Sequence, residues 1–270
     1  MMSATVSVRQ AARSDAMSVL ARWGLAARAA IYLLIGVLAI ALATGSRQGE
    51  TDQHGAMQEL TRHTGGTALV WIIGIGLAGY ALWRLSEAAF GVVGEGKKAG
   101  PRVQSFARAV IYAFFAVTAF KIVSHAGASS QAGQQELWTA KAMQHPGGRW
   151  AVGIVGAIVV VCGLVLAWEG VRRKFEKYLD MSPMTSTVRA VVELLGVVGT
   201  VARGIVFALA GVFIISAAVN YDPKKAGGLD RALRELADTS AGPWLLVAAA
   251  VGLIMFGVYG FAEAKSRRTA

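Results

Sequence analysis

Ala107-Arg108-Ala109-Val110-Ile111-Tyr112 decides the fold of this chain, because closely similar hexapeptides stand at two other places in it. The first copy is Ala27-Arg28-Ala29-Ala30-Ile31-Tyr32, and the third is Ala202-Arg203-Gly204-Ile205-Val206-Phe207. Each copy places an arginine near the start of a long apolar run and an aromatic residue four positions later, so both side chains share one face of a helix. The pattern predicts a chain built from three repeats.

Six apolar runs follow one another along the sequence, and each is close to the ~20 residues that a helix needs to cross a bilayer. They are residues 25–44, 67–90, 106–124, 150–168, about 194–219 and 244–262. Consecutive runs pair into three hairpins. We therefore predict an all-α, polytopic integral membrane protein with six transmembrane helices, arranged as three tandem helical hairpins with pseudo-threefold symmetry.

A constant spacing supports the repeat. The last glycine before each even-numbered run is Gly66, Gly148 or Gly242, and a glutamate follows each of them after twenty-one residues, at Glu87, Glu169 and Glu263. Identical offsets at a fixed period are the signature of tandem structural repeats.

These features divide the chain into six parts. The predicted boundaries are an N-terminal tail at 1–22, hairpins at 23–90, 103–170 and 194–264, a basic linker at 171–193 and a C-terminal tail at 265–270.

The distribution of basic residues predicts the orientation. The side of the membrane that holds both tails carries 18 Lys and Arg, against 9 on the other side, while each side carries 8 acidic residues. By the positive-inside rule, both termini lie in the cytoplasm. The net charge of +11 is therefore mostly a topology signal. No single basic patch interleaved with aromatics suggests nucleic-acid binding.

The three Ala-Arg motifs, together with Tyr80-Ala81-Leu82-Trp83-Arg84-Leu85-Ser86-Glu87-Ala88, resemble a bacterial membrane family known as domain of unknown function 1206. The resemblance covers about residues 20–266 and implies three two-helix repeats. The second repeat departs from the motif with Ala167-Trp168-Glu169-Gly170, and the third has Phe207 in place of tyrosine. The family implies no activity, but it does imply the bacterial cytoplasmic (inner) membrane as the location.

Repeated charges at membrane depth are the candidate site. Each motif arginine stands sixteen residues from the outer end of its run, or about 24 Å, so it lies roughly 6 Å inside a hydrocarbon core about 30 Å thick. We expect each arginine to reach a glutamate of its own or a neighbouring hairpin, either as structural pairing or as a pathway for a proton, an anion or a lipid head group. The candidate residues are Arg28, Arg108, Arg203, Glu87, Glu169 and Glu263, with the motif aromatics Tyr32, Tyr112 and Phe207.

No catalytic or cofactor site is predicted. His54, His63, His125 and His145 fall in or beside the outer loops without ligand spacing, so we expect solvated histidines and no metal. The single cysteine, Cys162, excludes an internal disulfide.

The sequence favours a non-enzymatic membrane scaffold or accessory subunit. The alternative is a transporter or channel for a small solute, an ion or a lipid, with a path between the hairpins. The expected partners are the lipid bilayer, anionic lipid at the cytoplasmic face and another membrane protein.

Overall fold

The computed structural model describes residues 15–46, 49–92, 98–124, 130–238 and 241–267. Six helices among them are long and apolar enough to cross a membrane, which confirms the predicted fold class. They are α2 (Asp15–Ala43), α4 (Gly66–Phe90), α5 (Ala99–Val123), α7 (Gly148–Val171), α8 (Ser186–Asn220) and α10 (Gly242–Ser266). Inside a bilayer a helix satisfies its own backbone hydrogen bonds, so apolar runs of this length are stable as helices there.

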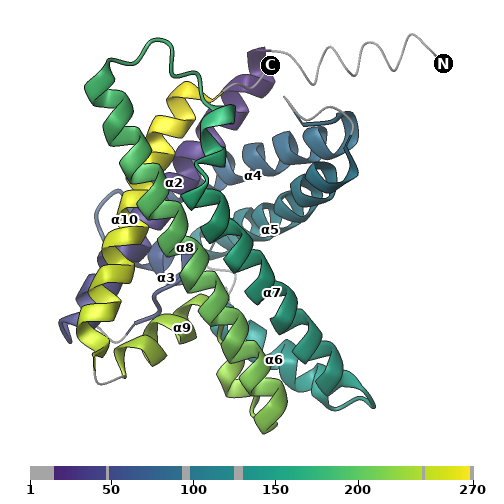
Figure 1. Ribbon diagram of the computed structural model, residues 1–270. Helices are drawn as coiled ribbons and strands as arrows, with labels where there is room; N and C mark the ends of the chain where they lie inside the picture. The colour runs from purple at the N-terminus through teal and green to yellow at the C-terminus, as the bar shows by residue number, and fades with distance from the viewer. Residues whose placement is uncertain (1–14, 47–48, 93–97, 125–129, 239–240, 268–270) are drawn as a thin grey trace.

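Three short helices cover the end of the bundle opposite to the start of α2 and the end of α10 (Figure 1). They are α3 (Gln53–Thr61), α6 (Gln131–Met143) and α9 (Gly228–Ala237), one in each repeat. The 3₁₀ segment η2 (Pro223–Ala226) precedes α9, and η1 (Lys174–Tyr178) connects α7 to α8 at the other end. Beyond η1, the linker reaches α10, because the backbone N–H of Asp180 donates to the carbonyl of Ser266 at 2.7 Å.

The repeated glycines allow each short helix to meet the following long helix in a tight corner. A Cβ on Gly66, Gly148 or Gly242 would overlap the carbonyl oxygen of Leu60, Ala142 or Ala237 respectively, near the end of the short helix before it. Only a residue without a side chain fits such a close approach. This shared contact explains why a glycine stands at the same offset in all three repeats.

The six long helices form a ring that is open at one place. Along the ring the packed neighbours are α5, α4, α2, α10, α8 and α7. The most extensive contacts join helices of different repeats: α4 with α5, α7 with α8, and α10 with α2. Within the part of the chain that the structure describes, α5 and α7 make no extended contact, although they belong to the same repeat. The first and third hairpins are closed, and the second is spread open.

Small residues permit the closest helix pair, α7 and α8. A Cβ on Gly156 would lie 2.9 Å from the backbone nitrogen of Ile215, and a Cβ on Gly211 would lie 2.6 Å from that of Val160. Gly163 and Gly204 meet the opposite backbone in the same way. Membrane helices associate through such small-residue faces. In lipid there is no hydrophobic driving force between helices, so close van der Waals packing takes its place. Figure 1 shows α7 and α8 side by side along their length.

Candidate functional site

The three motif arginines meet at the end of the bundle that carries η1 and the last turn of α10. Arg28 on α2, Arg108 on α5 and Arg203 on α8 all line one cavity of about 520 Å³. Two arginines outside the motif, Arg84 and Arg267, line it as well. We call this space the arginine cavity. The repeat therefore brings its charges to one place, as expected if they share a role.

Arg28 forms the predicted ion pair with a glutamate of another repeat. Its Nη2 lies 2.6 Å from Oε2 of Glu263, and both side chains are buried. Arg267, the residue directly after α10, also pairs with Glu263. Arg28 Nη1 is 3.4 Å from the hydroxyl oxygen of Tyr80. These contacts join the first repeat to the third at the end of the bundle that holds the arginine cavity.

A second buried network joins the first repeat to the second. Arg84 donates to the Tyr80 hydroxyl from Nε at 2.9 Å and from Nη2 at 2.7 Å, and its Nη1 lies 2.7 Å from Oε2 of Glu87. Ser105 on α5 donates to the same carboxylate oxygen at 3.0 Å. Glu87 is thus neutralised by an arginine of its own helix, not by the motif arginine Arg108.

Arg203 is held by aromatic rings instead of a carboxylate. Its Nε donates to the hydroxyl of Tyr32 at 3.0 Å, and its guanidinium lies about 5 Å from the ring centroids of Tyr32, Phe207 and Phe256. Among the described residues, no carboxylate is within ion-pair distance of it. Two of the predicted motif aromatics therefore act on this arginine, and the third, Tyr112, packs against Tyr80 with ring centroids 4.6 Å apart.

Arg108 has neither a hydrogen-bond nor an ion-pair partner in the described part of the chain, and its side chain borders the cavity. Glu169, which the repeat spacing makes a candidate partner for a motif arginine, lies 3.6 Å from Lys174 of η1 instead. The expected pairing of every motif arginine with a glutamate is therefore observed for Arg28 alone.

The charges in and beside the cavity do not balance. Five arginines and two lysines line the cavity, against three carboxylates in or beside it, Glu87, Glu169 and Glu263, which leaves an excess of four positive charges among the described residues. In addition, the Nε–H groups of Arg28 and Arg267 have no acceptor among the described residues, although both residues are only 7% exposed. Buried arginine donors without acceptors are uncommon and unfavourable. The arrangement can therefore accept an anion.

Sequence reasoning missed Arg84, Arg267 and Tyr80 as members of this site. The signal was present for the arginines, because Arg84 precedes Glu87 by three residues and Arg267 follows Glu263 by four. Both offsets place a cation and a carboxylate on one helix face. Neither offset recurs as an Arg–Glu pair in all three repeats, so a search limited to threefold patterns overlooks them.

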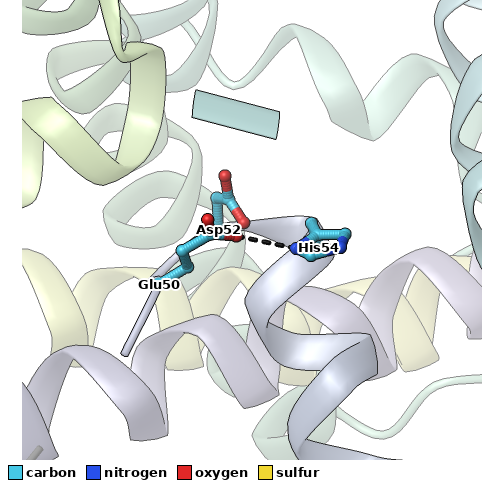
Figure 2. A group of neighbouring side chains, drawn as sticks. All are labelled: Glu50, Asp52 and His54. Atoms are coloured by element: carbon cyan, nitrogen blue, oxygen red, sulfur yellow. Dashed lines mark hydrogen bonds and ion pairs between the residues drawn. The ribbon is translucent and has the colours of Figure 1, made fainter. Parts of the chain in front are cut away.

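A second buried polar cluster lies at the opposite end, where the loop before α3 meets α9. Asp52 caps α3 by accepting from the backbone N–H of Gly55 at 2.9 Å. His54 Nδ1 lies 2.7 Å from Oε2 of Glu50, and Figure 2 shows these three side chains gathered on one side of the loop. From α9, Asp230 accepts from the backbone N–H of Thr51 at 2.7 Å. Glu50, Asp52 and His54 place one potential ligand atom each within 4.8 Å of one another. The hydrogen bonds just described contact all three side chains, whereas the buried Nε2 of His54 has no hydrogen-bond partner among the described residues.

This cluster corrects one expectation. His54 was predicted to be solvated, but it is only 4% exposed, because α3 folds back against the long helices and its first turn is buried. His63 and His145 are exposed as expected, and His125 lies outside the described residues. The pKa of Asp52 is raised from 3.8 to about 7, mainly by burial and also by the nearby Glu50 and Asp230, while the Gly55 N–H and His54 act in the opposite direction.

Comparison with known proteins finds relatives of this architecture. The family described as Domain of Unknown Function (DUF1206) matches the chain three times, over residues 23–91, 103–173 and 198–267. The Bacillus subtilis (strain 168) protein called "Uncharacterized protein YxxB" is 34% identical over 241 residues, which cover 88% of this chain and 86% of that protein. No solved structure matches.

Arg28 and Arg108 should respond differently to truncation. Arg28→Ala leaves Glu263 with Arg267 as its one remaining arginine, and we expect it to lower the free energy of unfolding by about 3 kcal/mol, the lower end of the range for a broken buried pair. Arg108→Ala removes a charge that has no partner among the described residues, so the stability should stay constant or rise. Unfolding in uncharged detergent measures both, and equal losses for the two variants would contradict the different roles assigned to them.

Asp52 should make the stability depend on pH. Because its pKa is higher in the folded than in the unfolded chain, its contribution is complete below about pH 4 and is lost as the pH rises through 7. The full difference is on the order of 4 kcal/mol. Asp52→Asn keeps the cap and should melt at a higher temperature than the wild type at pH 8, with a smaller difference at pH 5. The control is Asp180→Asn, at an exposed carboxylate that also accepts from a backbone N–H. A wild-type difference between pH 5 and pH 8 that Asp52→Asn leaves unchanged would exclude Asp52 as its source.

Proposed function

The chain belongs to the DUF1206 family, and we propose that it is a membrane transport protein that binds an anionic substrate in the arginine cavity. The observation that carries the proposal is the state of Arg108 and Arg203. Both border the cavity from membrane-spanning helices, and among the described residues neither has a carboxylate within ion-pair distance.

The energetic argument starts from the cost of charge inside a membrane. A guanidinium stays protonated in proteins, so it cannot avoid this cost by losing its proton. Intramembrane arginines are consequently paired, or they face a water-filled path that an ion or a substrate uses. Arg28 and Arg84 follow the first rule, through Glu263 and Glu87. Arg108 follows the second, since it faces the cavity.

A scaffold offers a poorer account of the same residues. A structural charge network is most stable when each charge has a partner, because a lone buried charge is strongly unfavourable. In a scaffold, the excess of positive charge around the cavity would lower the stability without serving any purpose. For a binding site the excess is useful, because an anion that enters gains the missing partners. Arginine suits this task, since its planar donors match the geometry of phosphate and carboxylate groups.

We also propose that the arginine cavity opens toward the cytoplasm. The support is the charge asymmetry: 18 of the 27 Lys and Arg belong to the side of the membrane that carries the termini, η1 and the cavity. An anionic metabolite or lipid head group of the cytoplasmic side would be the substrate in this orientation.

Anion binding should appear as stabilisation by phosphate. Sodium phosphate, titrated against chloride at constant ionic strength, should raise the melting temperature of the purified wild-type protein in a saturable way, because a ligand of the folded state stabilises it. Arg108→Ala should weaken the apparent affinity by about tenfold or more, or ~1.4 kcal/mol.

The matched control is Arg189→Ala, which removes an arginine that is exposed, pairs with Glu193 and does not line the cavity. It should bind phosphate like the wild type. If phosphate has no effect on the wild type, or if Arg108→Ala responds equally, the transport proposal fails and a scaffold becomes the better account.

The orientation can be tested with single cysteines in a Cys162→Ala background. His63 at the α3 end and Arg173 beside η1 both have exposed side chains. In intact cells a membrane-impermeant maleimide should label His63→Cys, and it should label Arg173→Cys only after permeabilisation. The opposite result would reverse the proposed topology.

A further inference from the structure

The second repeat lacks two aromatic side chains that the other repeats place near the cavity. Fourteen and seventeen residues after the repeat glycine stand Tyr80 and Trp83 in the first repeat, and Phe256 and Tyr259 in the third. All four rings are buried. The equivalent residues of α7 are Cys162 and Val165, and both are exposed.

These rings close the junctions between repeats. Tyr80 of the first repeat packs against Tyr112 of the second, with ring centroids 4.6 Å apart. Phe256 of the third repeat packs against Tyr32 of the first, at 4.9 Å. In both cases the ring also lies beside Arg28, within 6 Å of its guanidinium. At the equivalent position of α7, Cys162 carries no ring and its side chain is exposed.

The positions that lack rings lie on α7, the helix that borders the open place in the helix ring. The span of α7 is 17% buried, against 56% for α4, and α5 and α7 make no extended contact among the described residues. In Figure 1, α7 keeps to its partner α8 over its whole length. Both helices line the arginine cavity, α5 with Pro101, Ser105 and Arg108 and α7 with Leu166 and Glu169. The cavity therefore lies at the end of this opening that is nearest to η1.

We propose that the anionic substrate is a phospholipid, which reaches the arginine cavity sideways from the membrane between α5 and α7. This inference rests on the proposed function and names its substrate class. The phosphate of the head group binds near Arg108 and Arg203, and the acyl chains lie along the apolar surface at Ile111, Cys162 and Val165.

The chemistry of both halves fits such a molecule. Arg108 stands about 24 Å from the far end of its span, so it lies roughly 6 Å inside the hydrocarbon boundary, within reach of a head group. Arg28 and Arg267 line the same cavity and add to the positive charge around a head group. The walls above them are apolar, since Ile111 and Val165 are exposed on the transmembrane helices. A fully water-soluble anion would gain nothing from these walls, whereas an acyl chain would make favourable apolar contacts with them.

Lipid binding is measured by native mass spectrometry on the full-length protein, delipidated in neutral detergent and then given equal amounts of phosphatidylglycerol and phosphatidylcholine. We expect one phosphatidylglycerol per chain and at least tenfold lower occupancy by phosphatidylcholine, whose ammonium opposes the basic cavity. The variant Cys162→Phe/Val165→Trp restores the two rings and should lower the phosphatidylglycerol occupancy at least tenfold, while its melting temperature still rises with inorganic phosphate.

Leu164→Phe is the control for added bulk. Leu164 is exposed, does not line the cavity, and stands two positions before Leu166, or about 200° around the helix. It should load phosphatidylglycerol like the wild type. Equal loading of Cys162→Phe/Val165→Trp would overturn the lateral route. Stabilisation by inorganic phosphate without any bound lipid would overturn the lipid proposal and leave the proposed function intact, and the absence of both effects would remove both.

The native cysteine provides a second measurement that needs no variant. Cys162 lies four residues from Leu166, on the same face of α7. Its reaction with N-ethylmaleimide in delipidated protein should slow several-fold when phosphatidylglycerol is added, and it should not slow with phosphatidylcholine or inorganic phosphate. A rate that phosphatidylglycerol leaves unchanged would show that no acyl chain covers this face, and would overturn the lateral route even if the double variant failed to fold.

Discussion

A guanidinium keeps its charge inside a membrane, and the arrangement of the helices follows from where each one finds a partner. Arg28 pairs with Glu263, which fixes α2 against α10 and so closes the ring between the first and third repeats. Arg84, Tyr80 and Glu87 form a second network that Ser105 extends to α5. The third motif arginine, Arg203, relies on rings of the first and third repeats, and no buried ion pair joins the second repeat to the third in the described chain.

Much of the fold could be predicted, because the physical signals are local. A span of about twenty apolar residues forms a transmembrane helix whatever surrounds it. The glycines Gly66, Gly148 and Gly242 were also informative, since each permits the same contact with the short helix before it. The site was predictable in its members but only partly in its contacts. The repeat spacing identified the arginines that meet in the cavity, whereas Arg84, Arg267 and Tyr80 depart from threefold symmetry and were overlooked.

The contacts themselves depend on packing between repeats, which spacing along the chain does not encode. Glu169 has the same offset as Glu87 and Glu263, yet it lies beside Lys174 of η1, a segment whose position depends on the linker. His54 is polar and follows a loop, so its sequence resembles that of a solvated residue. Its burial results from the approach of α3 to the long helices and of α9 to the preceding loop. Both cases require tertiary structure, and both involve residues that only one repeat uses in this way.

The asymmetry of the three repeats has a mechanical consequence. The junction between the first and third repeats is fastened at both ends: Arg28 meets Glu263 at one end, and Asp230 meets the backbone of Thr51 at the other. The second repeat has no comparable contact between its own long helices in the described chain, and its missing rings leave exposed apolar surface at Cys162 and Val165. Among helices that line the cavity, α5 and α7 are therefore the pair of one repeat that is held together least in the described chain. A ring built from identical repeats would open equally at three places. Divergence in one repeat restricts the opening to a single side, next to Arg108, which has no partner within the described ranges.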